Sequence, residues 1–154
     1  KGYTEYRAAS QITRLPRMMG FQAAGAAPIV LGKVVEQPQT VATAIRIGNP
    51  ASWSSALKAV EESSGAIDMV TDDEILQAYT LVAATEGVFC EPASAASVAG
   101  VAKLHRNKIL REGDTVVCTL TGHGLKDADT AISVSKQPLT VKATRDEVAR
   151  LLNV

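Results

Sequence analysis

The sequence predicts an α/β fold, with a mostly parallel sheet that is covered by helices on both faces. Apolar runs that are typical of buried strands alternate with helical patterns along most of the 154 residues, an order that indicates βα units. These runs are almost continuously apolar, as strands covered on both faces are. Because aromatic residues make up only 4% of the chain, we expect a core built mainly from alanine, valine, isoleucine and leucine.

The first third of the chain is predicted from breaks between apolar segments. A helix over 3–14 should end before Pro16, because proline disfavours helix at the residue that precedes it. A buried strand is expected over 17–24 and a short apolar segment over 29–35. For 40–47, periodicity does not decide between a helix and a strand.

The next helix and strand are predicted from a cap and a stop signal. Ser52 can cap a helix over 53–63, in which apolar residues recur at a spacing of three to four. Gly65 is expected to end this helix, because glycine adopts the left-handed conformation that follows many helices. A strand is then predicted over 66–70.

Two further helices begin at recognisable caps. Thr71 and Glu74 have the spacing of a capping box, and the helix that they open should run to Gly87. After a short extended piece, Pro92 suits the first turn of a helix, where its missing N–H is no loss. That helix is rich in small residues and is predicted to run from Ala93 to about Leu104.

The end of the chain changes in character. Residues 115–120 are predicted as the clearest strand, bounded by turn residues on both sides. Residues 133–140 are polar and contain a proline, and 144–147 can cap a last short helix that ends at Leu152. We therefore predict two parts: 1–132 as a portion of a catalytic domain, and 133–154 as a linker with an appended helix.

Composition excludes several classes of partner. Sixteen basic residues balance sixteen acidic ones, which argues against a nucleic-acid-binding or anionic-membrane-binding surface. No apolar run approaches the roughly twenty residues that span a bilayer. Cys90 and Cys118 each lie in an apolar run, where buried free thiols are expected, and no metal-binding pattern occurs. We predict a reduced, cytoplasmic protein whose chain reads as the interior of a longer one.

The best candidate for a ligand site is the segment 119–124, at the end of the predicted last strand. Ligands of open α/β sheets bind beyond the carboxyl ends of the strands. Thr121 can project its hydroxyl past the sheet, and Gly122 can let the backbone approach a ligand closely. The alternative is a tight turn that needs positive φ. His123, between two glycines, is expected to make local hydrogen bonds rather than to act as a catalyst.

Two other strand ends could contribute to the site. Glu91 stands at the positive end of a helix, which stabilises an anion, and Ser94 follows one turn later. The alternative for Glu91 is a plain carboxylate at a helix N-terminus, and the alternative for Ser94 is close packing of helix and sheet. Arg46 ends an apolar segment and is expected to form an intramolecular salt bridge, whereas His105 lies in a basic stretch and should be solvated.

Four segments taken together resemble the threonine synthase family, a branch of the fold type II, or tryptophan synthase β, pyridoxal-phosphate enzymes. They are ATAIRIGNPASW at 42–53, EGVFCEPASAA at 86–96, TLTGHGLKD at 119–127 and QAAGAAP at 22–28. The resemblance covers about residues 1–132. It implies that the chain is part of the large domain of such an enzyme.

The resemblance implies a lyase of threonine biosynthesis with pyridoxal 5'-phosphate as its cofactor. The implied reaction converts O-phospho-L-homoserine and water to L-threonine and phosphate, by γ-elimination and β-hydration on the cofactor. Thr121 matches the family's hydroxyl that hydrogen-bonds the pyridine nitrogen, and Gly122 would permit the turn beneath the ring. Glu91 and Ser94 would line the pocket. A homodimer is also implied, without nucleic acid or membrane partners.

The nucleophile that the family requires is missing. Its Schiff-base lysine lies in a Ser-Phe-Lys-Asp-Arg-like segment upstream, and none of the eight lysines here matches it. Lys126 follows a glycine turn in a different motif, so no catalytic residue and no metal ligand is assigned. The resemblance thus implies a carboxyl-terminal part that needs its amino-terminal part, which carries that lysine, as a partner.

Two alternatives remain open. One is a serine/threonine dehydratase of the same fold, which eliminates at Cβ without a substrate phosphate and fits the segment 46–50 less well. The other is a stand-alone, non-catalytic domain that binds a metabolite at 119–124. This alternative predicts independent folding and binding without any lysine adduct.

Overall fold

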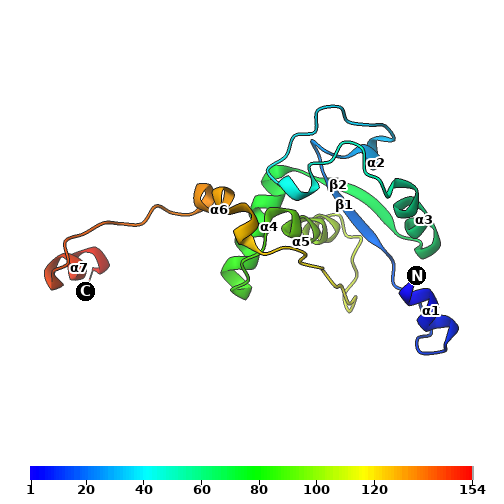
Figure 1. Cartoon of the computed structure of the whole chain (residues 1–154). Helices are drawn as coiled ribbons and strands as arrows, with labels where there is room; N and C mark the ends of the chain where they lie inside the picture. Colours follow the sequence, from blue (N-terminus) through cyan, green and yellow to red (C-terminus); the bar gives the residue numbers. More distant parts are fainter. Residues whose placement is uncertain (154) are drawn as a thin grey trace.

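The sheet has two parallel strands in a computed structural model that describes residues 1–153 (Figure 1). Strand β1 (Met19–Ala23) pairs with β2 (Ala66–Val70) in a register that joins Met19 to Ala66 and Ala23 to Val70. Both predicted strands are confirmed. Parallel strands require a long crossover, and the 42 residues between these strands hold α2 (Pro28–Leu31), the 3₁₀ turn η1 (Thr43–Ile45) and α3 (Trp53–Ser63).

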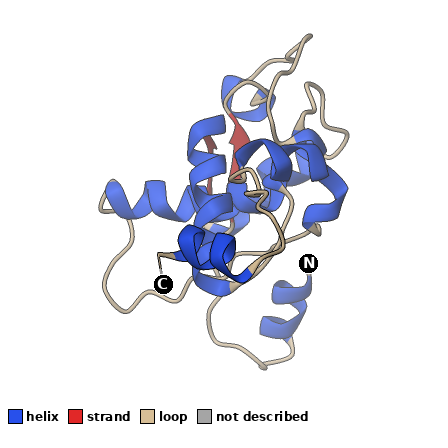
Figure 2. Cartoon of the chain, turned by 90° about the vertical axis from the view of Figure 1, so that its left-hand side faces the viewer, coloured by secondary structure: helices blue, strands red, loops and turns tan. Residues whose placement is uncertain are grey.

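Helices cover both faces of this sheet, as predicted. Side chains alternate along a strand, so Phe21 and Gln22 point to opposite faces. Phe21 meets Gly100 of α5 (Pro92–Arg106). On the other face, the side-chain oxygen of Gln22 accepts hydrogen bonds from the N–H groups of Ile29 and Val30, at 3.0 and 3.2 Å. Figure 2 shows the two strands enclosed among helices.

The core lies between the sheet, α5 and α4 (Asp72–Glu86), the two helices that pack together along the centre of Figure 1. Alanine dominates it, together with a few larger side chains, which confirms the expectation from the low aromatic content. The buried cluster is Ala23, Ala42, Val70, Ile75, Ala78, Tyr79, Val82, Cys90, Ala95, Ala96 and Ala99. Small side chains let α4 and α5 approach closely, because little volume separates the two backbones.

Several local predictions are confirmed at helix ends. The capping box of α4 is complete: Thr71 Oγ1 accepts from Glu74 N at 3.2 Å, and Glu74 Oε2 accepts from Thr71 N at 2.9 Å. Gly87 ends this helix with φ +65°, a conformation that glycine adopts without steric cost. Pro92 occupies the first turn of α5 as predicted.

The caps of α3 differ from prediction, although its bounds agree. Ser52 makes no side-chain cap hydrogen bond, and Ser64 rather than Gly65 takes the left-handed conformation, with φ 52°. Gly65 is needed for a different reason: a Cβ there would lie 1.9 Å from the carbonyl oxygen of Met18. The close approach of the chain before β1 therefore decides where this glycine stands.

Three predicted segments, 3–14, 29–35 and 40–47, contain only short helices or turns. The first helix, α1, spans only Gly2–Ala8, buries no residue and gives way to Ser10 with φ 57°. The segment 29–35 contributes the end of α2, and 40–47 is neither a helix nor a strand but contains η1. The carboxylate of Asp72 holds this segment, accepting from Thr40 Oγ1 at 2.5 Å and Val41 N at 3.1 Å.

Residues 115–120, predicted as the clearest strand, do not form one within the described part of the chain. The segment lies largely exposed, and Val117 retains 85% of its surface accessible. An extended segment becomes a strand only through hydrogen bonds to a neighbour, and β1 and β2 pair with each other. The apolar pattern of this segment therefore did not predict strand pairing.

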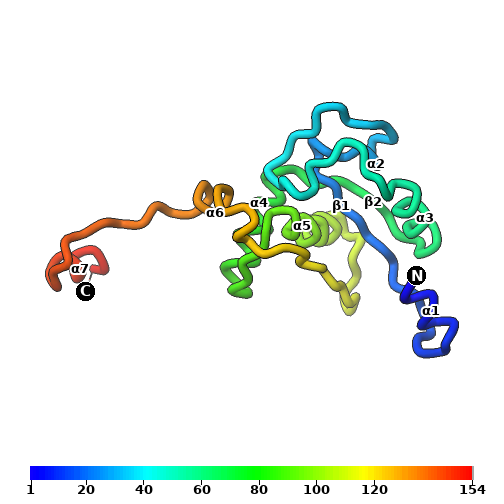
Figure 3. Tube along the Cα trace, in the orientation of Figure 1, coloured from blue at the N-terminus to red at the C-terminus, as the bar shows by residue number. Residues whose placement is uncertain are grey.

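The chain ends in elements that only partly match the prediction. The 3₁₀ turn η2 (Gly124–Asp127) and α6 (Ala128–Val134) were not predicted, whereas α7 (Arg145–Leu152) was. Figures 1 and 3 show α7 standing apart from the rest, at the end of an extended connection. Position 154 lies outside the described residues. Among residues 1–153, no helix is both long enough and apolar enough to cross a membrane.

An ion pair ties α5 to β2. Lys103 Nζ lies 2.7 Å from Asp68 Oδ2 and donates to the Met69 carbonyl oxygen at 2.6 Å. The hydrogen bond from Lys103 holds the pKa of Asp68 below its ordinary value of 3.8, against the opposing effect of partial burial. Because the folded-state pKa is the lower one, this stabilisation is present above pH 3.8 and is lost as pH falls through the folded-state value.

We expect Asp68→Asn to lower the free energy of unfolding near pH 7 by at most about 1 kcal/mol, because both side chains are partly exposed and the attraction is screened. Urea unfolding of both proteins at pH 7 and at successively lower pH measures the difference. It should shrink towards zero once Asp68 is protonated in the folded protein as well. A difference that stays constant over this range would show that the ion pair is not its cause.

Candidate functional site

The segment 119–124 runs back against the start of α5, so that the first two predicted strand-end sites become one. Cys90 and His123 form an isolated antiparallel bridge. Its neighbours extend the contact: Glu91 N donates to the Gly122 carbonyl oxygen at 2.9 Å, and Gly124 N donates to that of Phe89 at 3.0 Å. Backbone hydrogen bonds therefore fix this loop against the residues that precede the helix.

Ser94 connects the helix to the two predicted cofactor-binding residues. Its Oγ lies 2.9 Å from Gly122 N and 3.1 Å from Thr121 Oγ1. Ser94 is only 2% exposed, whereas Thr121 is exposed. The buried serine is thus hydrogen-bonded to a threonine that is exposed.

A glycine is required at position 122 because the Glu91 side chain lies very close to its Cα, and not because its φ is positive. A Cβ there would lie 2.0 Å from Glu91 Oε1, and one at Gly124 would lie 2.3 Å from Cε2 of Phe89. Neither glycine is among those with positive φ, so the alternative of a positive-φ turn is wrong. The loop needs both glycines because it passes directly over the side chains before α5.

His123 makes the predicted local hydrogen bond, and His105 is exposed as predicted. His123 Nδ1 accepts a local hydrogen bond from Leu125 N at 3.2 Å, and its ring meets that of Phe89 edge-on, with centroids 5.4 Å apart. His105 is exposed near the end of α5. Among the hydrogen bonds of residues 1–153, neither ring is joined to Thr121 or Ser94.

The third strand-end site lies beside the same loop but differs from prediction at its charged residue. Thr43 of η1 donates to Asp127 Oδ2 at 3.4 Å, which connects this turn to η2. Arg46 is exposed and makes no ion pair among residues 1–153, so the expected intramolecular salt bridge is wrong.

Burial suppresses ionisation of the nearby thiols and phenol. It raises the pKa of the buried Cys90 thiol, and the negative charge of Glu91 raises that pKa further. It also raises the pKa of Tyr79, with smaller effects of Cys90 and Asp127. Burial likewise raises the pKa of Cys118, which is half-buried rather than buried as expected. These groups stay protonated at neutral pH, so none is a ready nucleophile.

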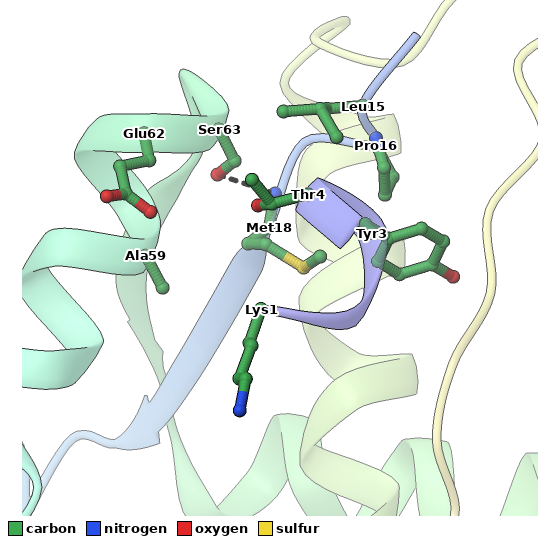
Figure 4. Close-up of a pocket in the computed structure, with 9 residues that line it drawn as sticks. All are labelled: Lys1, Tyr3, Thr4, Leu15, Pro16, Met18, Ala59, Glu62 and Ser63. Carbon is green, nitrogen blue, oxygen red and sulfur yellow. Dashed lines mark hydrogen bonds between the residues drawn. The ribbon is translucent and has the colours of Figure 1, made fainter. Parts of the chain in front are cut away.

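Two hollows on the surface lie elsewhere. A cavity of about 70 Å³ lies between α1 and α3 at the amino end of β1, lined by Tyr3, Met18 and Ser63 among others (Figure 4). A larger, open hollow of about 660 Å³ lies on the outer face of α4 near Val134. Neither is lined by Thr121; this threonine is exposed and, with Gly122, forms an open wall.

That wall fits one side of a planar, nitrogen-containing ring. Thr121 is exposed, and its hydroxyl is hydrogen-bonded to that of the buried Ser94, which holds it in place at the wall. Gly122 presents backbone without a side chain above it, and the buried carboxylate of Glu91 lies directly beside it. The residues present therefore suit a pyridine ring. Ser94 was expected to line the pocket; that it would lie beneath Thr121 was not predictable, because its small-residue surroundings indicated only close packing.

The fold and this wall agree with the comparisons to known proteins. Residues 2–122 match the family model described as pyridoxal-phosphate dependent enzyme. The chain belongs to this family, whose members depend on pyridoxal phosphate. A fungal L-serine ammonia-lyase from Rhizomucor miehei shares the fold, with a TM-score of 0.64 and 19% identity over 86% of this chain and 45% of its own.

Curated relatives of the chain are threonine synthases. The protein from Mycobacterium leprae is 57% identical over 96% of this chain and 42% of its own length. The protein from Bacillus sp. (strain ULM1) is 59% identical over 98% of this chain and 42% of its own. That from Methanocaldococcus jannaschii is 44% identical over 99% and 40%. The chain therefore spans about two fifths of the length of these relatives.

Proposed function

We propose that this chain forms the carboxyl-terminal part of a threonine synthase, which converts O-phospho-L-homoserine and water into L-threonine and phosphate. The observation that carries the proposal is the high identity to threonine synthases along nearly the whole chain. The contact of Ser94, Thr121 and Gly122 supports it, because it builds one wall for the cofactor ring. In this proposal, 1–132 belong to the catalytic domain and 133–154 form a linker and an appended helix.

Each proposed site residue has a role that follows from its surroundings. When bound, pyridoxal phosphate supplies an electron sink that eases removal of protons from the substrate. Thr121 would donate a hydrogen bond to the ring nitrogen, and Gly122 would leave space for the ring. Glu91 and Ser94 support the loop from the start of α5. The hydroxyl is neutral, so it suits an unprotonated nitrogen, whereas a carboxylate would hold that nitrogen protonated.

The proposal places the Schiff-base lysine on an amino-terminal part, without which this chain would be inactive. A reduced, cytoplasmic compartment and a homodimer complete the proposal; the two free cysteines support the compartment. The dehydratase alternative rests on the shared fold alone, because the ammonia-lyase is only 19% identical. The stand-alone binding domain gains no support from relatives that are all more than twice as long.

A test of this division is to trap the cofactor with borohydride in the purified protein and to identify the labelled peptide by mass spectrometry. We expect the label on a lysine of the amino-terminal part, in the same polypeptide or in one that copurifies. A label on any lysine of residues 1–154 would overturn the division. Absence of any label and of cofactor absorbance, from a folded chain without a companion, would favour the binding domain.

We expect Thr121→Val in the full-length enzyme to weaken cofactor binding about tenfold, since one net hydrogen bond is lost without a change in side-chain size. The cofactor's absorbance spectrum should shift and turnover should fall. Spectral titration with pyridoxal phosphate and a steady-state assay measure these effects. Thr119→Val is the matched control, because Thr119 is also exposed but has no hydrogen bond to Ser94 among the described residues. An unchanged spectrum in Thr121→Val would remove the ring-nitrogen role.

A further inference from the structure

The last helix, α7, has an apolar stripe that is exposed. Val148, Leu151 and Leu152 are three and four residues apart, so they share one side of the helix. All three are exposed, and no residue of α7 is buried. Helices shorter than about 12 residues are marginal in water and are stabilised mainly by packing of such a face. Because α7 has eight residues, it needs a partner surface to persist.

The open hollow on the outer face of α4 is an apolar surface of matching size. Leu76, Leu81 and Ala84 line it, together with Val134 at the end of α6. Leu81 is 52% exposed, although it lies in the middle of this lining. The lining on α4 extends over about 16 Å from Asp73 to Ala84, and α7 is about 12 Å long. One short helix therefore fits along the hollow.

The linker begins at the hollow itself. Val134, which lines the hollow, is the last residue of α6, and α6 lies beside α4 (Figure 1). Residues 135–144 then lead to α7 and can reach at most about 36 Å when extended. A linker this short holds α7 near the hollow at an effective concentration of about a millimolar. A second copy in dilute solution does not reach this concentration, so the chain's own helix is the favoured occupant.

One pair of opposite charges indicates how α7 would lie. Asp73 lines one end of the hollow, and Arg145 begins α7. Neither side chain has an ion pair among residues 1–153. If the two meet, Leu152 lies close to Leu81, because seven residues separate 145 from 152 and eight separate 73 from 81. An ion pair at an exposed rim contributes little affinity, so its effect is to set the direction of the helix.

We propose that α7 docks in the hollow on α4 of its own chain, with residues 135–144 as the tether. Its apolar stripe would cover Leu76, Leu81 and Val134, and Arg145 would meet Asp73. Docking removes two exposed apolar surfaces from water at once, which is the favourable term. It gives a role to a tail that lies outside residues 2–122, the part that matches the family model.

Disulfide trapping in the full-length enzyme tests the contact. With Leu81→Cys and Leu152→Cys together, mild oxidation should form a disulfide, which requires Cα atoms within about 7 Å of one another. Peptide mapping by mass spectrometry identifies it. The control pair is Leu81→Cys with Arg150→Cys, since Arg150 lies two residues before Leu152 on the opposite side of α7; this pair should lose the cross-link. Equal cross-linking of both pairs, or none with Leu152→Cys, would overturn the proposal.

Mixing isotopically labelled and unlabelled enzyme before oxidation identifies which chain supplies α7. We expect both cysteines of the disulfide in the same polypeptide, with one isotope label. A disulfide that joins labelled and unlabelled chains in the proportion of random pairing would show that a second copy occupies the hollow, which contradicts the proposal.

Hydrogen exchange tests whether the hollow stabilises α7. In Leu81→Asp, the amides of α7 should exchange about ten times faster, the equivalent of one leucine no longer withdrawn from water. The control is Leu57→Asp, because Leu57 of α3 is similarly exposed, at 48%, but does not line the hollow. Amides of α5 should keep their protection in both variants. Equal exchange of α7 in Leu81→Asp and in the wild type would mean that the hollow does not hold it.

The amino-terminal part of the enzyme is the remaining occupant to test. In Leu81→Cys enzyme that ends at Thr144, and so lacks α7, the new thiol should react with a maleimide about ten times faster than in Leu81→Cys enzyme of full length. Equally slow labelling of the two would show that the amino-terminal part covers the hollow. Equally fast labelling would show that nothing does. Either result would overturn the docking of α7.

Discussion

Gly100→Ala is expected to destabilise the protein by about 1–3 kcal/mol, the usual cost of an extra methyl group in a packed core. This runs against helix propensity, by which alanine in place of glycine would stabilise a helix by about 1 kcal/mol. A Cβ at Gly100 would lie 2.2 Å from Cδ2 of Phe21. The ring is anchored on β1 and Gly100 is buried in α5, so one of the two must move and loosen the core.

Thermal or urea unfolding of the wild type and the variant measures this effect. Gly2→Ala is the matched control: Gly2 is also helical, but nothing lies within 4 Å of its added Cβ, so this variant should be neutral or slightly stabilised. Phe21→Leu introduced together with Gly100→Ala should cost less than the sum of the two single changes. A Gly100→Ala protein as stable as the wild type would mean that α5 does not press on Phe21.

Gly122→Ala is expected to have the largest effect on the site, weakening cofactor binding by about a hundredfold. The added Cβ would lie 2.0 Å from Glu91 Oε1. Glu91 is only 5% exposed, so its carboxylate has little free space into which it can turn. The loop would have to lift away from α5 and would take Thr121 out of reach of Ser94.

Spectral titration of the full-length enzyme with pyridoxal phosphate measures the loss. Glu91→Ser removes the atoms that the new methyl group would meet, so adding it to Gly122→Ala should restore part of the binding. The double-mutant cycle isolates this coupling from any separate contribution of the carboxylate. Normal cofactor affinity in Gly122→Ala would show that the loop tolerates a side chain and that the close packing against Glu91 is not required.

Elements whose signals are local could be predicted from the sequence. The capping box at Thr71 and Glu74 forms between residues three apart, and Pro92 opens α5 because its ring suits the first turn. The strand 66–70 is continuously buried or half-buried, as its apolar pattern indicated. In each case the residues that decide the structure are neighbours along the chain.

Elements that depend on a distant partner could not be predicted in this way. The segment 115–120 has the composition of a strand but lacks a strand beside it within the described chain. Gly65 has the features of a helix stop. The structure requires a glycine there for another reason: the Met18 carbonyl oxygen lies where a Cβ would be. Arg46 was expected to meet a carboxylate, but it is exposed and has no ion pair among residues 1–153.

In the segment 119–124, some features could be predicted from the sequence and others depend on the tertiary structure. The sequence by itself indicated that Thr121 and Gly122 belong to a ligand site, because a hydroxyl and a glycine followed an apolar run. Only the tertiary structure decided that Ser94, 27 residues earlier, lies buried against them. It also decided that Gly122 is needed because Glu91 fills the space that a side chain would take. Residue types reveal what chemistry a side chain can perform, whereas its hydrogen-bond partners depend on which atoms the fold brings within 3 Å or so of one another.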